Sequence, residues 1–114
     1  IAKNLGEISL ENALGNIISM CELARANKIK PLICSVLPCD HFFWRPEVKG
    51  QEEEIVRFNE MLKDYAKSAN IPYVDYHSVM KNDKNGLPKK YAEDGCHPTK
   101  EGYEVMKRII LEAL

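Results

Sequence analysis

Asp94 and His97 stand three residues apart in the stretch EDGCHPTKEGYEVM, residues 93–106, and their side chains have the chemistry of an acid–imidazole pair. A histidine is the usual general base near neutral pH. A carboxylate on its other ring nitrogen fixes the tautomer and stabilises the imidazolium. Gly95 and Pro98 favour a turn, and a turn can bring positions i and i+3 together. The sequence therefore predicts a hydrogen-bonded pair that serves a third group.

The spacing of this pair also has a plainer interpretation. Asp94 would then be a local turn former and His97 a surface residue, because Asp-x-x-His pairs occur by chance. His77, in VDYHSVM, is predicted to be a histidine of a loop or sheet end rather than a catalytic partner. The role of the pair therefore has to be inferred from the helices and strands around it.

The elements expected around the pair alternate between helix and strand. Apolar residues recur at helical spacing in three segments, 10–24, 55–69 and 103–113, the last beginning with Tyr103. Ser9 and Thr99 are placed to cap the first and last of these helices. Between them lie two apolar strands, 32–37 in PLICSVLP and 71–76 in IPYVDY.

The order α-β-α-β-α is typical of a doubly wound parallel sheet with helices on both faces. Two strands alone cannot give a continuously apolar strand a neighbour on each edge. We therefore expect residues 1–114 to be the C-terminal portion of one larger domain. The fold class is predicted to be a three-layer α/β/α parallel sheet, of which two strands and three main helices are present.

The stretch DGCHPTKEGY resembles the last motif of the SGNH (GDSL-type) hydrolases, which is Asp-Gly-x-His-Pro followed by Gly-Tyr. The matching residues are Asp94, Gly95, His97, Pro98, Gly102 and Tyr103. The segment KPLICSVLP and the aromatic loop after it also look like a strand and a substrate-side loop of an esterase-like branch. The resemblance implies a flavodoxin-like fold and a Ser-His-Asp ester hydrolase that uses no metal or other cofactor, with His97 as base and Asp94 as its orienting carboxylate.

The serine nucleophile of that family lies near the N-terminus in a Gly-Asp-Ser context, and no serine here has Gly-Asp before it. The serines are Ser9, Ser19, Ser35, Ser68 and Ser78. The family's middle motifs, which supply a glycine amide and an asparagine to the oxyanion hole, are also missing. We therefore expect a fragment that keeps the base and acid and is inactive by itself.

The aromatic loop, defined here as residues 38–50 (PCDHFFWRPEVKG), follows the first strand, where ligands bind in open α/β sheets. It predicts substrate-binding roles for Trp44, Phe43 and Arg45. Simple packing over the sheet, and an Arg45–Glu47 ion pair, are the alternatives. A different class of function, a non-catalytic binding or assembly module that uses this loop, also fits the sequence.

Four cysteines show no Cys-x-x-Cys spacing and are predicted to be free thiols, which favours a reducing compartment and leaves an extracytoplasmic location open. A nucleophilic Cys96 would need its own base and oxyanion donors. The alternative is a metal site, although its spacing is not a tight zinc pattern. Its ligands would be drawn from Cys34, Cys39, His41, Cys96 and His97.

The overall composition limits the partners. Hydrophobic residues make up 45% of the 114 residues, and 16 Lys and Arg balance 17 Asp and Glu. This balance gives no electrostatic reason to expect nucleic acid, and no apolar stretch is long enough to span a membrane. We expect a small-molecule ester substrate, of carbohydrate or lipid origin, and association either with an N-terminal half or with a second copy through the open sheet edge.

Overall fold

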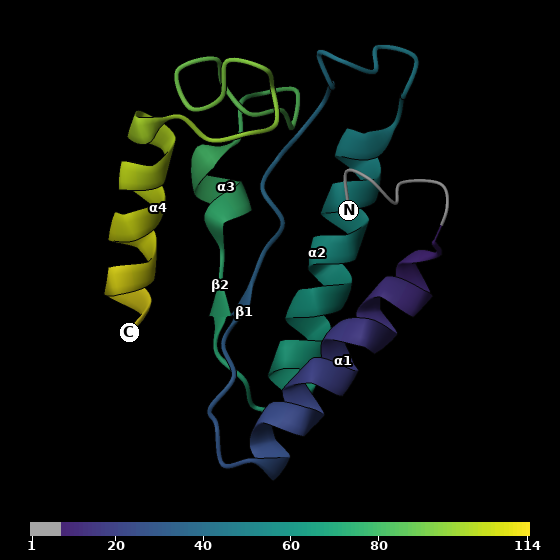
Figure 1. Cartoon of the computed structure of the whole chain (residues 1–114), viewed down its shortest axis with the longest axis vertical. Coiled ribbons are helices and arrows are strands. Elements are labelled where there is room, and N and C mark those ends of the chain that lie inside the picture. Colours follow the sequence, from purple (N-terminus) through teal and green to yellow (C-terminus); the bar gives the residue numbers. More distant parts are fainter. Residues whose placement is uncertain (1–7) are drawn as a thin grey trace.

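The computed structural model describes residues 8–114, and its helices and strands alternate as the sequence predicts (Figure 1). The elements are α1 (Leu10–Ala26), β1 (Ile33–Cys34), α2 (Gln51–Ser68), β2 (Tyr73–Val74), α3 (Tyr76–Met80) and α4 (Lys100–Ala113). The two strands run parallel, with Ile33 opposite Tyr73 and Cys34 opposite Val74. A parallel pair with helical crossovers is the predicted α/β arrangement.

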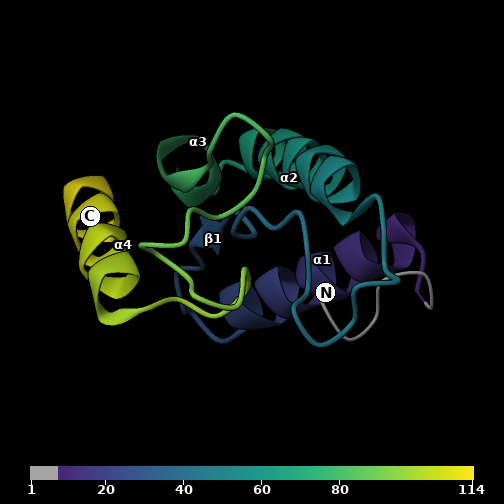
Figure 2. The same ribbon diagram turned by 90° about the horizontal axis from the view of Figure 1, so that it is seen from above.

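The strands separate two helical layers, so the described part of the chain has an α/β/α build. Alternate strand residues face opposite sides: Ile33 and Tyr73 pack toward α1 and α2, whereas Cys34 and Val74 pack toward α4. Seen from above, α4 lies on one side of the strands and α1 and α2 lie on the other (Figure 2). This alternation explains why both strands are apolar throughout.

The core on the α1 and α2 side joins both helices to β1. Its buried members are Cys21, Ile33, Phe58, Leu62, Ala66 and Ile71. The predicted apolar stripe of the second helix is confirmed, since Phe58, Leu62 and Ala66 are almost completely buried. The stripe of α1 is only half-buried in this structure.

The core on the α4 side joins β2, α3 and α4. Its buried members are Val74, Tyr76, Met80, Leu87, Ala92 and Val105. Met106, Ile109 and Ile110 pack against it as predicted. Tyr103, which the periodicity placed on the same stripe, is instead 58% exposed, and Gly102 and Val105 are the buried residues of that helix.

Both strands are shorter than the sequence predicts, and hydrogen bonds made by side chains explain why. Beyond β1, the Asn59 side chain accepts a hydrogen bond from the Val36 N–H (2.8 Å) and donates one to the Val36 carbonyl (3.0 Å). Beyond β2, the Asp75 carboxylate accepts from the Ser78 N–H (3.0 Å) and caps α3. The predicted strand end at Tyr76 is therefore the first residue of a short helix.

The predicted helix caps are confirmed. Ser9 Oγ accepts from the Asn12 N–H (3.0 Å) at the start of α1, and Thr99 Oγ1 accepts from the Gly102 N–H (3.2 Å) at the start of α4. Each bond satisfies one of the donors that a helix N-terminus leaves free. Thr99 thereby fixes where α4 begins, directly after His97 and Pro98.

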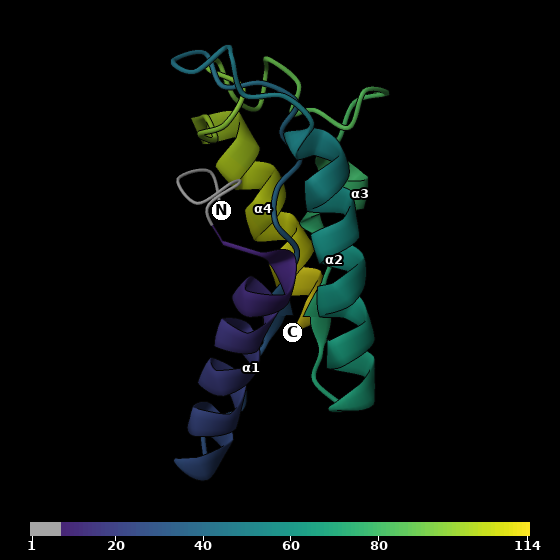
Figure 3. The same ribbon diagram turned by 90° about the vertical axis from the view of Figure 1, so that its right-hand side faces the viewer.

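The aromatic loop and the loop between α3 and α4 gather at one end of the molecule, beyond the carboxyl ends of both strands (Figures 1 and 3). This is the end at which open parallel sheets bind ligands. Across residues 8–114 the structure contains no helix with the length and apolar character needed to cross a bilayer.

Candidate active site

Asp94 and His97 form the predicted pair in a tight turn. His97 Nδ1 lies 2.7 Å from Asp94 Oδ2. The other carboxylate oxygen, Oδ1, accepts from the backbone N–H groups of Cys96 (2.9 Å) and His97 (2.8 Å). Gly95 has a φ of +84°, a left-handed conformation that glycine adopts without steric cost. The carboxylate thus closes its own turn and holds the imidazole at the same time.

The hydrogen bonds to Asp94 set its charge. They come from the His97 N–H first, then from the His97 side chain and the Cys96 N–H, and they lower the pKa of Asp94 to about 2. An ionised carboxylate accepts hydrogen bonds only, so His97 Nδ1 carries the proton between them. In the neutral imidazole, Nε2 is then the basic nitrogen. The His97 side chain is 72% exposed.

The segment before α4 fixes the turn from the other side. The Thr99 N–H donates to the Tyr91 carbonyl (2.6 Å), and Thr99 Oγ1 donates to the Lys90 carbonyl (2.8 Å). Gly102 lies so close that an added Cβ would be 2.7 Å from the Tyr91 carbonyl oxygen. The glycine and threonine of the motif therefore hold the first turn of α4 against residues 90 and 91.

Trp44 of the aromatic loop contacts the pair directly. Its ring stacks on the His97 imidazole, with 5.4 Å between centroids and 28° between planes. The ring of the buried Phe42 packs against the Trp44 indole, with 5.4 Å between the ring centroids. Phe43 is 79% exposed, and Arg45 Nε pairs with Glu47 Oε2 at 3.2 Å. Of the three predicted substrate residues, Trp44 is the one that the structure brings against His97.

A second Asp–His pair lies beside the first, and sequence reasoning missed its position. His41 Nδ1 is 2.8 Å from Asp40 Oδ1, and a Cβ added to Gly95 would lie 2.5 Å from His41 Nε2. The His41 ring therefore packs on the turn that carries Asp94 and His97. Adjacent Asp and His residues were visible in the sequence, but only the fold brings them to Gly95.

The cysteines and His77 are the other residues whose side chains could take part in chemistry. All four cysteines are free thiols. Among residues 8–114, no three His, Cys, Asp or Glu side chains are arranged to hold a metal ion. His77 lies in α3, buried rather than in a loop, where burial and then Lys81 lower its pKa.

Comparison with known proteins decides the family. The model of the GDSL-like lipase/acylhydrolase family matches residues 3–105. The chain belongs to the GDSL-like lipase/acylhydrolase family. The resemblance seen in the motif around Asp94 and His97 is thereby confirmed.

Solved structures agree with this GDSL-like assignment. A GDSL-like lipase from Bacteroides thetaiotaomicron is 43% identical and superposes with a TM-score of 0.91, over 98% of this chain and 55% of its own. A Bacteroides fragilis protein assigned as an acylhydrolase gives the same identity and TM-score, over 98% and 54%. The present chain thus spans little more than half the length of either.

A third solved structure agrees in fold alone. The esterase domain of the ZfL2-1 ORF1 protein from a zebrafish retrotransposon is 17% identical, with a TM-score of 0.74 over 97% of this chain and 66% of its own. The comparison with curated proteins gave no significant match. The predicted fold class, a flavodoxin-like α/β/α parallel sheet, is confirmed.

The serines of this GDSL-like chain have other structural positions. Ser9 caps α1, and Ser35 is buried where its Oγ accepts from the His77 N–H (3.0 Å). Ser68 Oγ donates to the Tyr65 carbonyl (2.9 Å), and Ser19 and Ser78 lie in α1 and α3. None of these described contacts joins a serine to His97.

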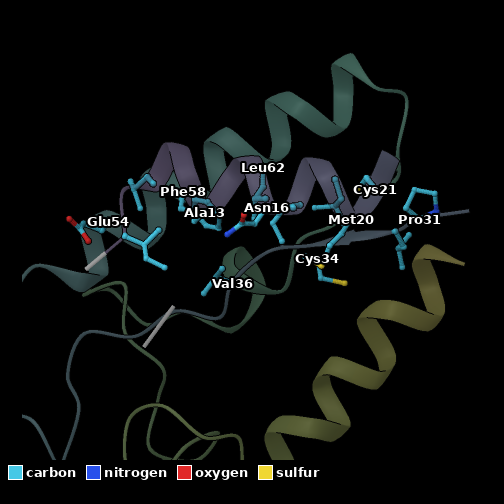
Figure 4. Close-up of a pocket in the computed structure, with 15 residues that line it drawn as sticks. Ala13, Asn16, Met20, Cys21, Pro31, Cys34, Val36, Glu54, Phe58 and Leu62 are labelled. Carbon is cyan, nitrogen blue, oxygen red and sulfur yellow. The ribbon is translucent and has the colours of Figure 1, made fainter. Parts of the chain in front are cut away.

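A cavity of about 460 Å³ lies away from the Asp94–His97 pair (Figure 4). Its walls come from α1, β1 and α2, with Leu10, Ile17, Met20, Val36 and Phe58 among them. No residue of the 94–97 turn lines it. This cavity is therefore an uncovered part of the core between the helices and the strand, and the candidate active site is the exposed pair.

Proposed function

We propose that this chain supplies the base and the orienting acid of a Ser-His-Asp ester hydrolase. The observation that carries the proposal is the 2.7 Å contact between Asp94 Oδ2 and Nδ1 of an exposed His97. It leaves Nε2 as the nitrogen able to accept a proton. Membership of the GDSL-like family supports acyl transfer as the reaction.

In the proposed mechanism, His97 Nε2 removes the proton of a serine hydroxyl as that oxygen attacks the ester carbonyl. The imidazolium formed is stabilised by the ionised Asp94, and it then protonates the departing alcohol. Water repeats the same steps on the acyl-enzyme and releases the acid. Because the pKa of Asp94 is about 2, the carboxylate stays charged throughout the neutral range.

The nucleophile, in this proposal, lies outside residues 1–114. The five serines have other positions, and the chain matches only 55% of the length of the Bacteroides thetaiotaomicron lipase. We propose that residues 1–114 form the C-terminal portion of one GDSL-like domain. The rest of that domain would provide the serine and the oxyanion donors, each worth about 3–4 kcal/mol in the transition state.

Substrate binding is proposed to involve the exposed aromatic residues beside His97. An ester carbonyl within reach of His97 Nε2 also lies near the Trp44 indole, because the two rings are stacked. Phe43 is exposed on the same loop, and Arg45 is available if it leaves Glu47. The proposed substrate is a small acyl or acetyl ester derived from a carbohydrate or a lipid.

The uncovered core supports the proposed association. Within residues 8–114, β1 has a strand neighbour on one side only, and the cavity beside it is mostly apolar. Covering apolar surface contributes about 25 cal/mol per Å². We propose that the remainder of the GDSL-like domain covers this face, or that a second copy does so in the isolated chain, which light scattering would detect as a dimer.

The test is hydrolysis of p-nitrophenyl acetate by the protein expressed from the complete reading frame that contains residues 1–114. His97→Ala should lower kcat/KM by roughly 10³-fold or more, and Asp94→Asn by a similar factor, because both act as one unit. His41→Ala is the matched control, since His41 also pairs with a carboxylate. Activity that survives His97→Ala but not His41→Ala would overturn the assignment.

The isolated 114-residue chain provides the second arm of this test. Without a nucleophile it should give no turnover above buffer. Turnover that survives purification and disappears on Ser78→Ala or Cys96→Ala would instead locate the nucleophile within these residues. The alternative function, a non-catalytic binding module, predicts an inactive full-length protein with an unchanged Asp94–His97 pair.

A further inference from the structure

Residues of the aromatic loop pack against successive residues of the 94–97 turn. His41 packs on Gly95, with its carbonyl oxygen 2.9 Å from where a Cβ of Gly95 would be. Trp44 stacks on His97. Between these two contacts, Cys96 packs against the buried cluster that contains Cys39, Phe42 and Ile55. The two segments are thus in contact on both sides of Cys96, which packs in the same cluster as Cys39.

The surroundings of the two thiols differ from those of the other cysteines. Cys39 is buried, and its sulfur donates to the His41 carbonyl at 3.2 Å within its own loop. Cys96 is partly exposed in the 94–97 turn. Burial raises the pKa of both thiols, and the neighbouring Cys96 raises that of Cys39 further. Cys21 and Cys34 lie near the α1–β1 cavity, elsewhere in the fold.

We propose that Cys39 and Cys96 form an oxidation site, in which a small-molecule disulfide converts the two thiols into a disulfide that joins the aromatic loop to the 94–97 turn. The inference rests on the packing of Cys96 against the cluster that contains Cys39, and on the His41–Gly95 and Trp44–His97 contacts on either side of Cys96. It concerns residues that the proposed ester hydrolysis does not use, and it holds whether or not that hydrolysis is correct.

The chemistry balances through two exchange steps. The more exposed Cys96 thiolate attacks oxidised glutathione, forming a mixed disulfide and releasing one glutathione thiolate. The Cys39 thiolate then attacks the Cys96 sulfur and releases the second glutathione. The protein loses two electrons and two protons, and one glutathione disulfide is reduced to two thiols.

The consequence is a covalent link across the candidate active site. Trp44 lies five residues after Cys39, and His97 directly follows Cys96. A disulfide here would close a long loop of the chain and restrict separation of the two stacked rings. The redox state of the protein would therefore set how freely the aromatic loop moves away from His97.

The test is incubation of the folded, reduced 114-residue chain with oxidised glutathione, followed by peptide mass spectrometry under non-reducing conditions. We expect a cross-linked peptide pair containing Cys39 and Cys96, with the loss of two hydrogen atoms. The melting temperature should rise by at least about 5 °C, and dithiothreitol should reverse the rise. The Cys21→Ala/Cys34→Ala double variant should behave in the same way.

Single variants test whether the disulfide forms because Cys39 and Cys96 are close, or because the thiols are generally reactive. Cys39→Ser should stop the reaction at a stable glutathione adduct on Cys96, and circular dichroism checks that this variant is folded. A wild-type chain that also stops at the Cys96 adduct would overturn the proposal, because Cys39 would then be out of reach. So would a disulfide that joins either residue to Cys21 or Cys34.

Discussion

The Trp44 indole stacks on the His97 imidazole, with 5.4 Å between the ring centroids and 28° between the ring planes. This contact joins the aromatic loop to the residue proposed as general base. Phe42 is buried, and its ring packs against the indole at 5.4 Å between centroids. The stacking therefore limits the directions in which the imidazole can turn, while Asp94 holds its Nδ1.

The first prediction follows from this stacking and needs only the isolated chain. The carbon-bound protons of His97 should resonate upfield of those of His41, because they lie over the face of an indole ring. Trp44→Leu should move them back toward ordinary positions. Proton NMR measures both. If the chemical shifts of the His97 protons are the same in Trp44→Leu as in the native chain, the two rings do not stack in solution.

A second prediction concerns stability in acid. The pKa of Asp94 is about 2 in the folded chain, below the ordinary value of about 3.9 expected when unfolded. A lowered carboxylate pKa stabilises the fold above the unfolded pKa, and this contribution is lost as the pH falls through the folded pKa. Asp94→Asn should therefore flatten the loss of unfolding free energy between about pH 4 and pH 2.

Urea unfolding at several pH values measures this effect. Asp64→Asn, which removes an exposed carboxylate on α2, is the matched control. It should leave the acid slope nearly unchanged. An Asp94→Asn slope that equals that of the native chain would mean that the His97 and Cys96 hydrogen bonds do not form.

A third prediction tests the packing that fixes the start of α4. An alanine Cβ at position 102 would lie 2.7 Å from the Tyr91 carbonyl oxygen, so Gly102→Ala should cost about 1–3 kcal/mol of unfolding free energy. Gly15, in α1, has nothing within 4 Å of an added Cβ. Gly15→Ala should therefore stabilise the chain by up to about 1 kcal/mol. Equal effects of both substitutions would contradict the described approach of α4 to Tyr91.

The fold was largely predictable because it follows from local patterns. Helical periodicity gave three of the helices, and uniformly apolar strands indicated a sheet covered on both faces. The predicted strand lengths were wrong because side-chain hydrogen bonds end the strands early. Asn59, which is distant in sequence, binds the Val36 backbone after β1, and Asp75 caps α3 directly after β2. Tyr103 was wrongly placed because periodicity cannot tell which side of a helical stripe meets the core.

The site was predictable where its geometry is local. Asp94 and His97 meet within one turn, so their spacing was informative. His41 packs on Gly95, and Cys96 packs on the cluster that contains Cys39, so both contacts join segments more than fifty residues apart that no short-range pattern signals. Residue type alone also did not indicate that Phe43 would be exposed, or decide whether Arg45 would pair with Glu47.

A fourth prediction concerns thiol reactivity. Burial first, and then the neighbouring Cys96 thiol, raise the pKa of Cys39 to about 12. At pH 8 its thiolate fraction is on the order of 10⁻⁴, so iodoacetamide should alkylate Cys39 far more slowly in the folded chain than in urea. Its rate should rise with pH, and Cys96, which is more exposed, should react before it. Peptide mass spectrometry over time measures each rate, and fast alkylation of Cys39 in the native state would contradict the burial.

The most direct test of the central claim is fluorophosphonate labelling of the protein expressed from the complete reading frame. Such a probe phosphonylates an activated serine, and peptide mass spectrometry locates it. The proposed mechanism predicts a label on one serine outside residues 1–114, with labelling lost in His97→Ala and retained in His41→Ala. A label on Ser78 or another of the five serines described above, or labelling that persists without His97, would contradict the assignment of Asp94 and His97 as the acid and base of this hydrolase.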